Sequence, residues 1–190
     1  STSFFPAKPL GCYGDGGAVF TNDDNLAESL LSIRIHGKGS NKYDNIRMGI
    51  NGRLDTIQAG ILLAKFNIFN EEIKKRNIVA GKYNELLKDT FKVQKIPHNH
   101  ISVWAQYSIL TRSNNHRKEL MDQLKRENIP TAVYYPKPLH LQTAFLKYGY
   151  QNGDFPITEN TSERIFSLPM HPYIKDKDIN KIAVLLKNTN

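Results

Sequence analysis

The sequence predicts a mixed α and β fold whose second half forms a small α+β domain, and three observations lead to this prediction. No proline interrupts residues 54–87. Apolar side chains keep a rough helical spacing there: Leu54, Ile57, Ile61, Ile68, Ile73 and Tyr83. After this stretch the patterns come in the order strand, strand, helix and strand, which is typical of an α+β unit.

The first half of the chain offers one strand and one helix before the long proline-free stretch. Residues 17–21 form a short β-prone run, and Asn22, Asp23 or Asp24 can cap a helix that carries Leu26 and should end at Gly37. Residues 37–41 have the composition of a mobile surface loop. Residues 54–87 are expected to form one or two long helices. Because such a helix often bridges two domains, we place a boundary near Asp89.

The second half should contain three strands and two helices. Residues 91–96 and 103–110 are strand candidates, and residues 129–135 form a third that ends at Pro136. Asn114 or Asn115 can cap the helix between them, which carries Leu120, Met121 and Leu124. In the last helix one apolar face comes after Asp176: Ile179, Ile182, Ala183 and Leu186.

Composition narrows the classes of function. The net charge is +8, but basic residues alternate with acids along the chain, so we expect neither nucleic acid nor membrane as a partner. Cys12 is the only cysteine, which excludes a disulfide within the chain and a zinc site built from cysteines. No two histidines have the spacing of a metal site on one helix, so we expect no metal. A reducing cytoplasm suits this composition.

The first chemical motif surrounds Lys8, which lies close to two phenylalanines and two prolines: Phe4, Phe5, Pro6 and Pro9. A lysine becomes an amine nucleophile when burial or a neighbouring cation lowers its pKa, and apolar, stiff surroundings favour this. A lysine between prolines is more often a solvated loop residue. The hydroxyl of Ser3 beside free backbone amides could hold a phosphate, or it could cap a turn.

Four segments in order resemble the DegT/DnrJ/EryC1/StrS family of pyridoxal-phosphate-dependent sugar aminotransferases. They are residues 3–18 (SFFPAKPLG and then YGDGGA), 49–59 (GINGRLDTIQA), 134–140 (YYPKPLH) and 167–172 (SLPMHP). The resemblance implies an α/β fold, the carboxyl-terminal half of a fold-type I transferase. Residues 1–89 would then be the end of the large cofactor-binding domain with the interdomain helix, and residues 90–190 the small α+β domain.

The resemblance also implies a role for individual residues. Lys8 would hold pyridoxal 5'-phosphate as a Schiff base and move a proton, and Ser3 would bind the cofactor phosphate. Asn51 would reach the phosphate of the neighbouring subunit's cofactor, and Arg53 would line the shared site. By the residues alone, Asn51 with Gly52 is a turn that caps the long helix and Arg53 is a surface charge.

Substrate binding is implied for Tyr134 and Tyr135. The family often has histidine where this chain has Tyr134, and tyrosine does not titrate near neutral pH, so a role of that histidine in substrate choice does not carry over.

The function implied by the resemblance is transfer of an amino group from glutamate to a nucleotide-linked keto sugar in surface polysaccharide or glycan biosynthesis, by a homodimer with shared active sites. Two alternatives are a sugar dehydratase, against which Lys8 speaks because those relatives carry histidine there, and a regulatory member without catalysis. The resemblance further implies an amino-terminal half with more cofactor contacts. We therefore expect these 190 residues alone to bind the cofactor weakly and to be inactive.

Overall fold

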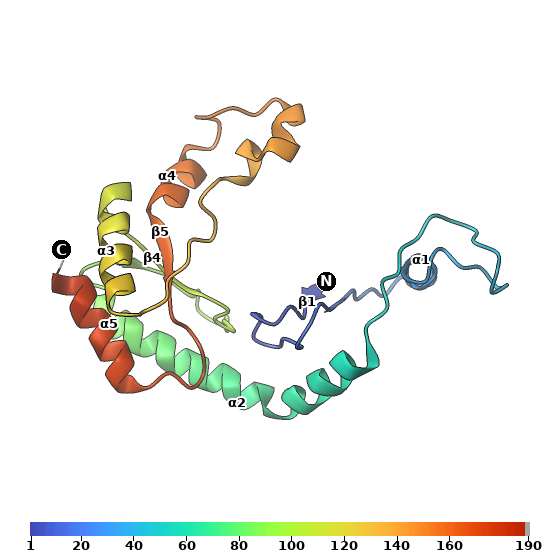
Figure 1. Cartoon of the computed structure of the whole chain (residues 1–190), viewed down its shortest axis with the longest axis horizontal. Coiled ribbons are helices and arrows are strands. Elements are labelled where there is room, and N and C mark those ends of the chain that lie inside the picture. The colour runs from blue at the N-terminus through green and yellow to red at the C-terminus, as the bar shows by residue number, and fades with distance from the viewer. Residues whose placement is uncertain (189–190) are drawn as a thin grey trace. The chain divides into compact units, whose positions relative to one another are not determined.

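The computed structural model describes residues 1–188, which form two compact units. The first comprises Ser1–Asn70 and the second begins at Glu71. Helix α2 (Thr56–Leu87) contributes to both units, because the division falls inside it (Figure 1). The predicted domain boundary near Asp89 lies just past the end of this helix and stays a prediction.

Short elements at the start of the first unit frame the Lys8 segment. Strand β1 (Thr2–Ser3) pairs antiparallel with β2 (Gly17–Ala18), so the chain between them is a closed loop. Helix α1 (Asp24–Arg34) begins after Asp23, whose carboxylate accepts a hydrogen bond of 3.1 Å from the Leu26 amide. The predicted strand and capped helix are confirmed, whereas β1 was not expected.

Two glycines allow two backbone segments, around Gly37 and around residues 47–49, to lie very close together after α1. Gly37 has a φ of +76°, and a Cβ atom there would lie 1.7 Å from the Arg47 carbonyl oxygen. A Cβ on Gly49 would lie 2.1 Å from the Gly37 nitrogen. Only glycine fits at either position, so the predicted helix end near Gly37 has a steric cause as well as a conformational one.

The long proline-free stretch forms one helix, α2, and of the predicted apolar stripe only Tyr83 is fully buried. Ile57 and Ile68 are 73% and 48% exposed. The buried positions in its second half recur at helical spacing: Arg76, Val79, Ala80, Tyr83 and Leu87. The sequence stripe was misleading because much of the apolar surface in the first unit is uncovered in this chain.

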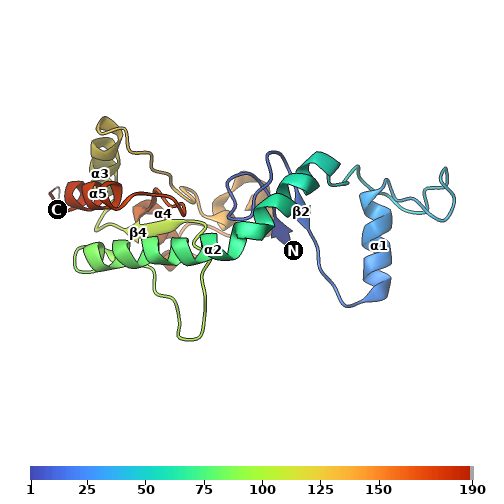
Figure 2. The ribbon, with the colours of Figure 1, turned by 90° about the horizontal axis from the view of Figure 1, so that it is seen from below.

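The second unit contains a three-stranded antiparallel sheet in the order β3, β4, β5. Its strands are β3 (Lys92–Val93), β4 (Tyr107–Leu110) and β5 (Ile165–Leu168). The connection between β3 and β4 is a long loop (Figure 2). The helices are α3 (Asn114–Arg126), α4 (Pro156–Arg164) and α5 (Asp176–Asn188), with 3-10 turns η1 (Leu139–Leu141) and η2 (Thr143–Tyr148).

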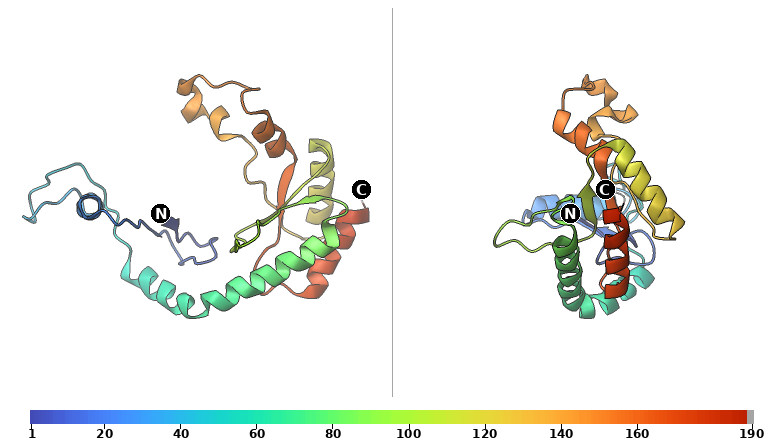
Figure 3. Two further views of the ribbon diagram at one scale, coloured as in Figure 1. Left: turned by 180° about the vertical axis from the view of Figure 1, so that it is seen from behind. Right: turned by 90° about the vertical axis from the view of Figure 1, so that its left-hand side faces the viewer.

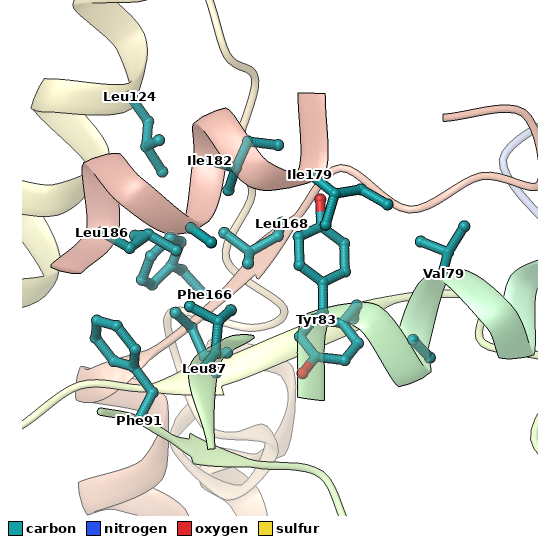
Figure 4. Close-up of a cluster of buried hydrophobic side chains, with 14 of the residues drawn as sticks. Val79, Tyr83, Leu87, Phe91, Leu124, Phe166, Leu168, Ile179, Ile182 and Leu186 are labelled. Carbon is teal, nitrogen blue, oxygen red and sulfur yellow. The ribbon is translucent and has the colours of Figure 1, made fainter. Parts of the chain in front are cut away.

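One hydrophobic core joins these elements. Tyr83 and Leu87 of α2, Leu124 of α3 and Ile182 of α5 meet Phe166 of β5 (Figure 4). Within this unit α5 runs alongside α2, where Lys82 and Asp176 form an ion pair of 2.6 Å, and α3 lies next to α5 (Figure 3). The predicted apolar face of α5 is confirmed, since all four of its residues are buried.

Two predictions for the second unit are wrong. Residues 129–135 form no strand and contribute a single bridge between Ala132 and Ser167, because Pro130 and Pro136 lack the N–H donors that a longer ladder needs. The third strand is β5 instead. Helix α3 is capped by Ser113, whose hydroxyl accepts from the His116 amide at 3.1 Å, and not by Asn114 or Asn115.

No helix of residues 1–188 is long and apolar enough to cross a membrane.

Candidate active site

The Lys8 segment is a tight turn whose backbone is bonded to itself. The Lys8 amide donates to the Phe5 carbonyl at 2.8 Å, and the Cys12 amide donates to the Phe4 carbonyl at 2.8 Å. The Phe4 amide in turn donates to Gly16 at 2.8 Å. These three hydrogen bonds close the loop on itself and constrain the backbone at Lys8, while the side chain of Lys8 remains exposed.

Gly11 and Cys12 form the interior of this loop. A Cβ on Gly11 would lie 2.6 Å from the Phe5 carbonyl oxygen, 2.8 Å from that of Pro6 and 3.0 Å from that of Lys8. Cys12 is fully buried, and its thiol lies 3.0 Å from the carbonyl oxygens of both Phe4 and Gly14. The loop is thus closed around a small interior with no room for a further methyl group.

Two side chains of α2 hold the loop from outside. The Gln58 side-chain oxygen accepts from the Tyr13 amide at 2.8 Å, and the Lys65 ammonium donates to the Gly11 carbonyl at 2.6 Å. Gln58 and Lys65 are seven residues apart and so lie on one face of the helix. Sequence reasoning did not identify either of them, because their spacing places them on one helix face but does not show what that face contacts.

Ser3 lies in the same loop as Lys8, as the sequence suggested. Its hydroxyl oxygen accepts from the Phe5 amide at 3.2 Å, and the side chain is exposed. The hydroxyl proton is left available to donate to an anion. Ser3 therefore caps this turn, and its role as a phosphate ligand stays a prediction.

Asn51 and Arg53 lie together on the exposed segment before α2. Two guanidinium nitrogens of Arg53 approach the Asn51 side-chain oxygen at 3.4 Å each. The Asn51 backbone forms a bridge with Ile35, and the Gly52 amide donates to Arg34 at 2.8 Å. The end of α1 thus positions both side chains at the surface, and their contact with a second subunit stays a prediction.

Tyr134 and Tyr135 line a pocket of about 480 Å³ in the second unit. One wall is the segment of residues 134–142, including Lys137 and Leu139, and the other is α4 with the start of β5. The two tyrosine rings pack edge to face with centroids 5.7 Å apart. The sequence identified both tyrosines but not α4, because residues 156–164 have neither a side-chain cap nor a strong apolar stripe.

A buried hydrogen bond between His140 and Glu159 joins the two walls of the pocket. His140 Nε2 lies 2.9 Å from Glu159 Oε1, and the two side chains are only 9% and 15% exposed. The backbone amides of Gly153 and Phe155 also donate to this carboxylate, at 2.8 and 3.2 Å. Burial opposes ionisation, but these hydrogen bonds and His140 together lower the pKa of Glu159 below its usual range.

The Lys8 loop fits the requirements of an aldehyde cofactor. Such a cofactor needs an accessible primary amine on a rigid backbone, and Lys8 supplies it from a turn that is packed too closely for a Cβ at Gly11. Among residues 1–188 no three metal-ligating side chains of histidine, cysteine, aspartate or glutamate lie together. The Lys8 amine and the Ser3 hydroxyl suit an organic cofactor with a carbonyl and an anionic group.

The fold and this loop define a class of protein: the chain has the fold of the carboxyl-terminal half of a fold-type I aminotransferase. An aminotransferase structure from Brucella abortus superimposes with a TM-score of 0.91 at 52% sequence identity, over 98% of this chain and 49% of that one. The DesV structure from S. venezuelae, which holds a ketimine intermediate, gives 0.90 at 30% identity, over 98% and 50%. The fold class expected from the sequence is confirmed.

The chain belongs to the DegT/DnrJ/EryC1/StrS aminotransferase family, whose model matches residues 1–187. A UDP-2-acetamido-2-deoxy-3-oxo-D-glucuronate aminotransferase of Pseudomonas aeruginosa is 46% identical over 98% of this chain and 50% of its own length. A protein of Geobacillus stearothermophilus named a pleiotropic regulatory protein is 41% identical over 95% of this chain and 50% of its own length. The chain thus spans about half the length of these relatives.

Proposed function

We propose that the intact protein transfers an amino group from glutamate to a keto sugar linked to a nucleotide, with pyridoxal 5'-phosphate as cofactor. Glutamate would become 2-oxoglutarate and the keto sugar an amino sugar. The observation that carries this proposal is the Lys8 turn, an exposed primary amine on a backbone fixed by its own hydrogen bonds. A relative at 46% identity named as an aminotransferase of a UDP-linked oxo sugar supports the substrate class.

Each of the site residues would have a separate task. Lys8 would hold the cofactor through Nζ and later accept and return a proton at that atom, and Ser3 would donate its hydroxyl proton to the phosphate. Tyr134 and Tyr135 would contact the substrate from their pocket. When bound, the cofactor supplies the electron sink that makes the proton transfer possible. We further propose a cytoplasmic homodimer in which Asn51 and Arg53 complete the partner's site.

The test replaces Lys8 in the intact protein. Lys8→Ala removes the amine, and Lys8→Arg supplies a guanidinium that cannot deprotonate to attack a carbonyl. Both should lose the visible absorbance of the bound cofactor and should form no 2-oxoglutarate from glutamate with a panel of keto nucleotide sugars. Lys88→Ala, at an exposed site after α2, is the matched control and should behave as the wild type. Near-normal turnover by either Lys8 variant would refute the assignment.

A regulatory role without catalysis is the second candidate, favoured by the name of the Geobacillus stearothermophilus relative. The same measurements separate the two functions. A purified wild type that shows no cofactor absorbance and no transfer with any sugar of the panel would support regulation. Cofactor absorbance that glutamate changes would support the aminotransferase.

A further inference from the structure

We propose that Glu159 is a positioning residue for the substrate site: its carboxylate, through His140, fixes the segment of residues 134–141. Tyr134 and Tyr135 lie at the start of this segment, and the role rests on the proposed function because that function makes them substrate contacts. All of these residues lie in the second unit. Glu159 would act through the segment that it holds and not on the substrate itself.

The segment has little apolar packing of its own. Residues 134–161 leave the core of the second unit, and α4 leads the chain back to it (Figure 1). None of these residues, all of which the structure describes, belongs to the hydrophobic core. Large apolar side chains stay exposed instead, among them Tyr135 at 69% and Leu139 at 67%. Apolar burial therefore contributes little to the conformation of this segment, and polar contacts have to hold it.

The Glu159 carboxylate gathers these polar contacts. Its Oε1 atom accepts hydrogen bonds from His140 Nε2 at 2.9 Å and from the Phe155 amide at 3.2 Å. Its Oε2 atom accepts from the Gly153 amide at 2.8 Å. The side chains of His140 and Glu159 are only 9% and 15% exposed, so water competes little for their contact. One side chain thus joins α4 to the loop before it and to the segment of the tyrosines.

All three partners of the carboxylate are donors, and this requires a charged acceptor. An ionised carboxylate can only accept, so His140 carries a proton on Nε2. A glutamine in place of Glu159 would turn its NH2 group toward at least one of these donors, whichever way the amide is oriented. Glu159→Gln therefore breaks a contact although it keeps the shape of the side chain.

His140 transmits this constraint to the tyrosines through a stiff stretch of backbone. Its ring packs on the Phe155 ring with centroids 4.7 Å apart, and the residue belongs to the 3-10 turn η1. Four residues separate His140 from Tyr135, and two of them are Pro136 and Pro138. Because proline fixes its own φ angle, the position of His140 restricts where Tyr135 can lie.

The chain is also anchored before the tyrosines. Ala132 and Ser167 of β5 form a bridge with hydrogen bonds of 3.3 and 2.7 Å. Tyr134 and Tyr135 thus lie between an anchor on the sheet and an anchor on α4. Loss of the His140 contact leaves only the first anchor, and a substrate must then order both tyrosines when it binds. The expected consequence is weaker substrate binding with little change in the chemical step.

A carboxylate in the first turn of a helix often does no more than cap that helix. The hydrogen bond from the Phe155 amide is of this kind, since Phe155 is the N-cap of α4. The contact with His140 is different, because it reaches 19 residues back to another segment. Substitutions of His140 therefore test positioning separately from capping.

The experiment compares four variants of the intact protein: Glu159→Gln, His140→Leu, His140→Gln and, as the control, Asp154→Asn. His140→Gln keeps an N–H donor for the carboxylate, whereas His140→Leu removes it. Asp154 Oδ2 accepts from the Gln151 amide at 2.7 Å in the loop before α4, a bond that an amide oxygen can also accept. Hydrogen exchange of residues 134–142 is measured without substrate, and KM and kcat are measured with the nucleotide sugar that the wild type uses.

Glu159→Gln and His140→Leu should exchange residues 134–142 about tenfold faster or more, because a hydrogen bond to a charged group is lost. The KM for the nucleotide sugar should rise about tenfold with kcat little changed, which is the signature of lost binding. The absorbance of the bound cofactor should stay at its wild-type level. His140→Gln should bring exchange and KM back toward the wild type, and Asp154→Asn should match it.

Wild-type exchange in both Glu159→Gln and His140→Leu would overturn the role of Glu159. Faster exchange with an unchanged KM would also overturn it, because the segment would then move without effect on the substrate. Equal increases of KM in His140→Gln and His140→Leu would do the same, since only one of them loses the donor. The proposed function has its own readout: a wild type that transfers no amino group refutes the aminotransferase, whereas faster exchange in the two variants would still support Glu159 as the residue that orders the segment.

Discussion

Replacement of Gly11 by alanine should disable the Lys8 turn without touching Lys8 itself. The added Cβ would approach three carbonyl oxygens, those of Phe5, Pro6 and Lys8, at 2.6, 2.8 and 3.0 Å. Ordinary contact begins near 3.4 Å, so these backbone atoms must retreat by about 0.4 to 0.8 Å. Because all three belong to the backbone of the turn, no flexible side chain can absorb the change.

The expected size of the effect depends on this displacement. Overpacking of a tight interior costs about 1 to 3 kcal/mol, and catalytic groups must be held within roughly 0.5 Å of their working position. A shift of the Lys8 carbonyl and Cα on that scale should lower kcat/KM for transamination by about tenfold to a hundredfold. The absorbance of the bound cofactor should fall at a given cofactor concentration, and the midpoint of thermal unfolding should decrease.

A second glycine provides the control. A Cβ on Gly81, at an exposed position six residues before the end of α2, would meet nothing within 4 Å. Gly81→Ala should therefore leave activity unchanged and raise the free energy of unfolding by about 1 kcal/mol, because alanine is the better helix former. Wild-type kcat/KM and wild-type absorbance in Gly11→Ala would show that the close approach of the backbone at Gly11 does not matter for Lys8.

Two further predictions address the shared site and the stability of the second unit. Mixed dimers of inactive Lys8→Ala and inactive Asn51→Asp protomers should regain activity, because each mixed dimer would contain one intact site; lack of recovery after verified subunit exchange would rule out sharing. His116 is 3% exposed, both its ring nitrogens lack a partner, and burial together with the smaller effect of the Arg112 charge lowers its pKa. The contribution of neutral, buried His116 to the free energy of unfolding is therefore fully present above the pKa of about 6.5 that histidine has in the unfolded chain. It is lost as the pH falls through the lower pKa of His116 in the folded chain. His116→Phe should flatten the loss of unfolding free energy between about pH 7 and 5, measured by urea denaturation, whereas an unaltered slope would assign the loss to other groups.

Local sequence signals predicted the elements that depend on local physics. Asp23 before an apolar stripe gives α1, the absence of proline gives α2, and the apolar face after Asp176 gives α5. The prediction of the third strand was wrong because the residues that pair in the sheet are remote from each other in sequence. Ser108 and Ser167, which bond across β4 and β5 at 2.8 Å, are separated by 59 positions. Strand β5 has only four residues, three of them apolar and one a serine, so it has no alternation that marks it as a strand.

The same reason limits prediction of the site. Lys8, Ser3 and the two tyrosines stand in short motifs from which their roles were predicted, and those roles stay predictions. Gln58 and Lys65 act on the loop from 45 and 54 residues away, so only the fold shows that they hold it. Glu159 likewise looks like a surface acid on a weak helix until the chain brings it to His140.

The Lys8 turn and the pocket beside Tyr134 and Tyr135 belong to different compact units, and this allows their functions to be separated. The contacts that fix the Lys8 turn, from Gln58 and Lys65, lie within the first unit. The contact that joins the pocket walls, between His140 and Glu159, lies within the second. Mutational effects add when the sites share no partners. Changes at Gly11 should therefore alter cofactor absorbance, whereas changes at Tyr134 or Tyr135 should alter the KM for the sugar substrate and leave cofactor absorbance intact.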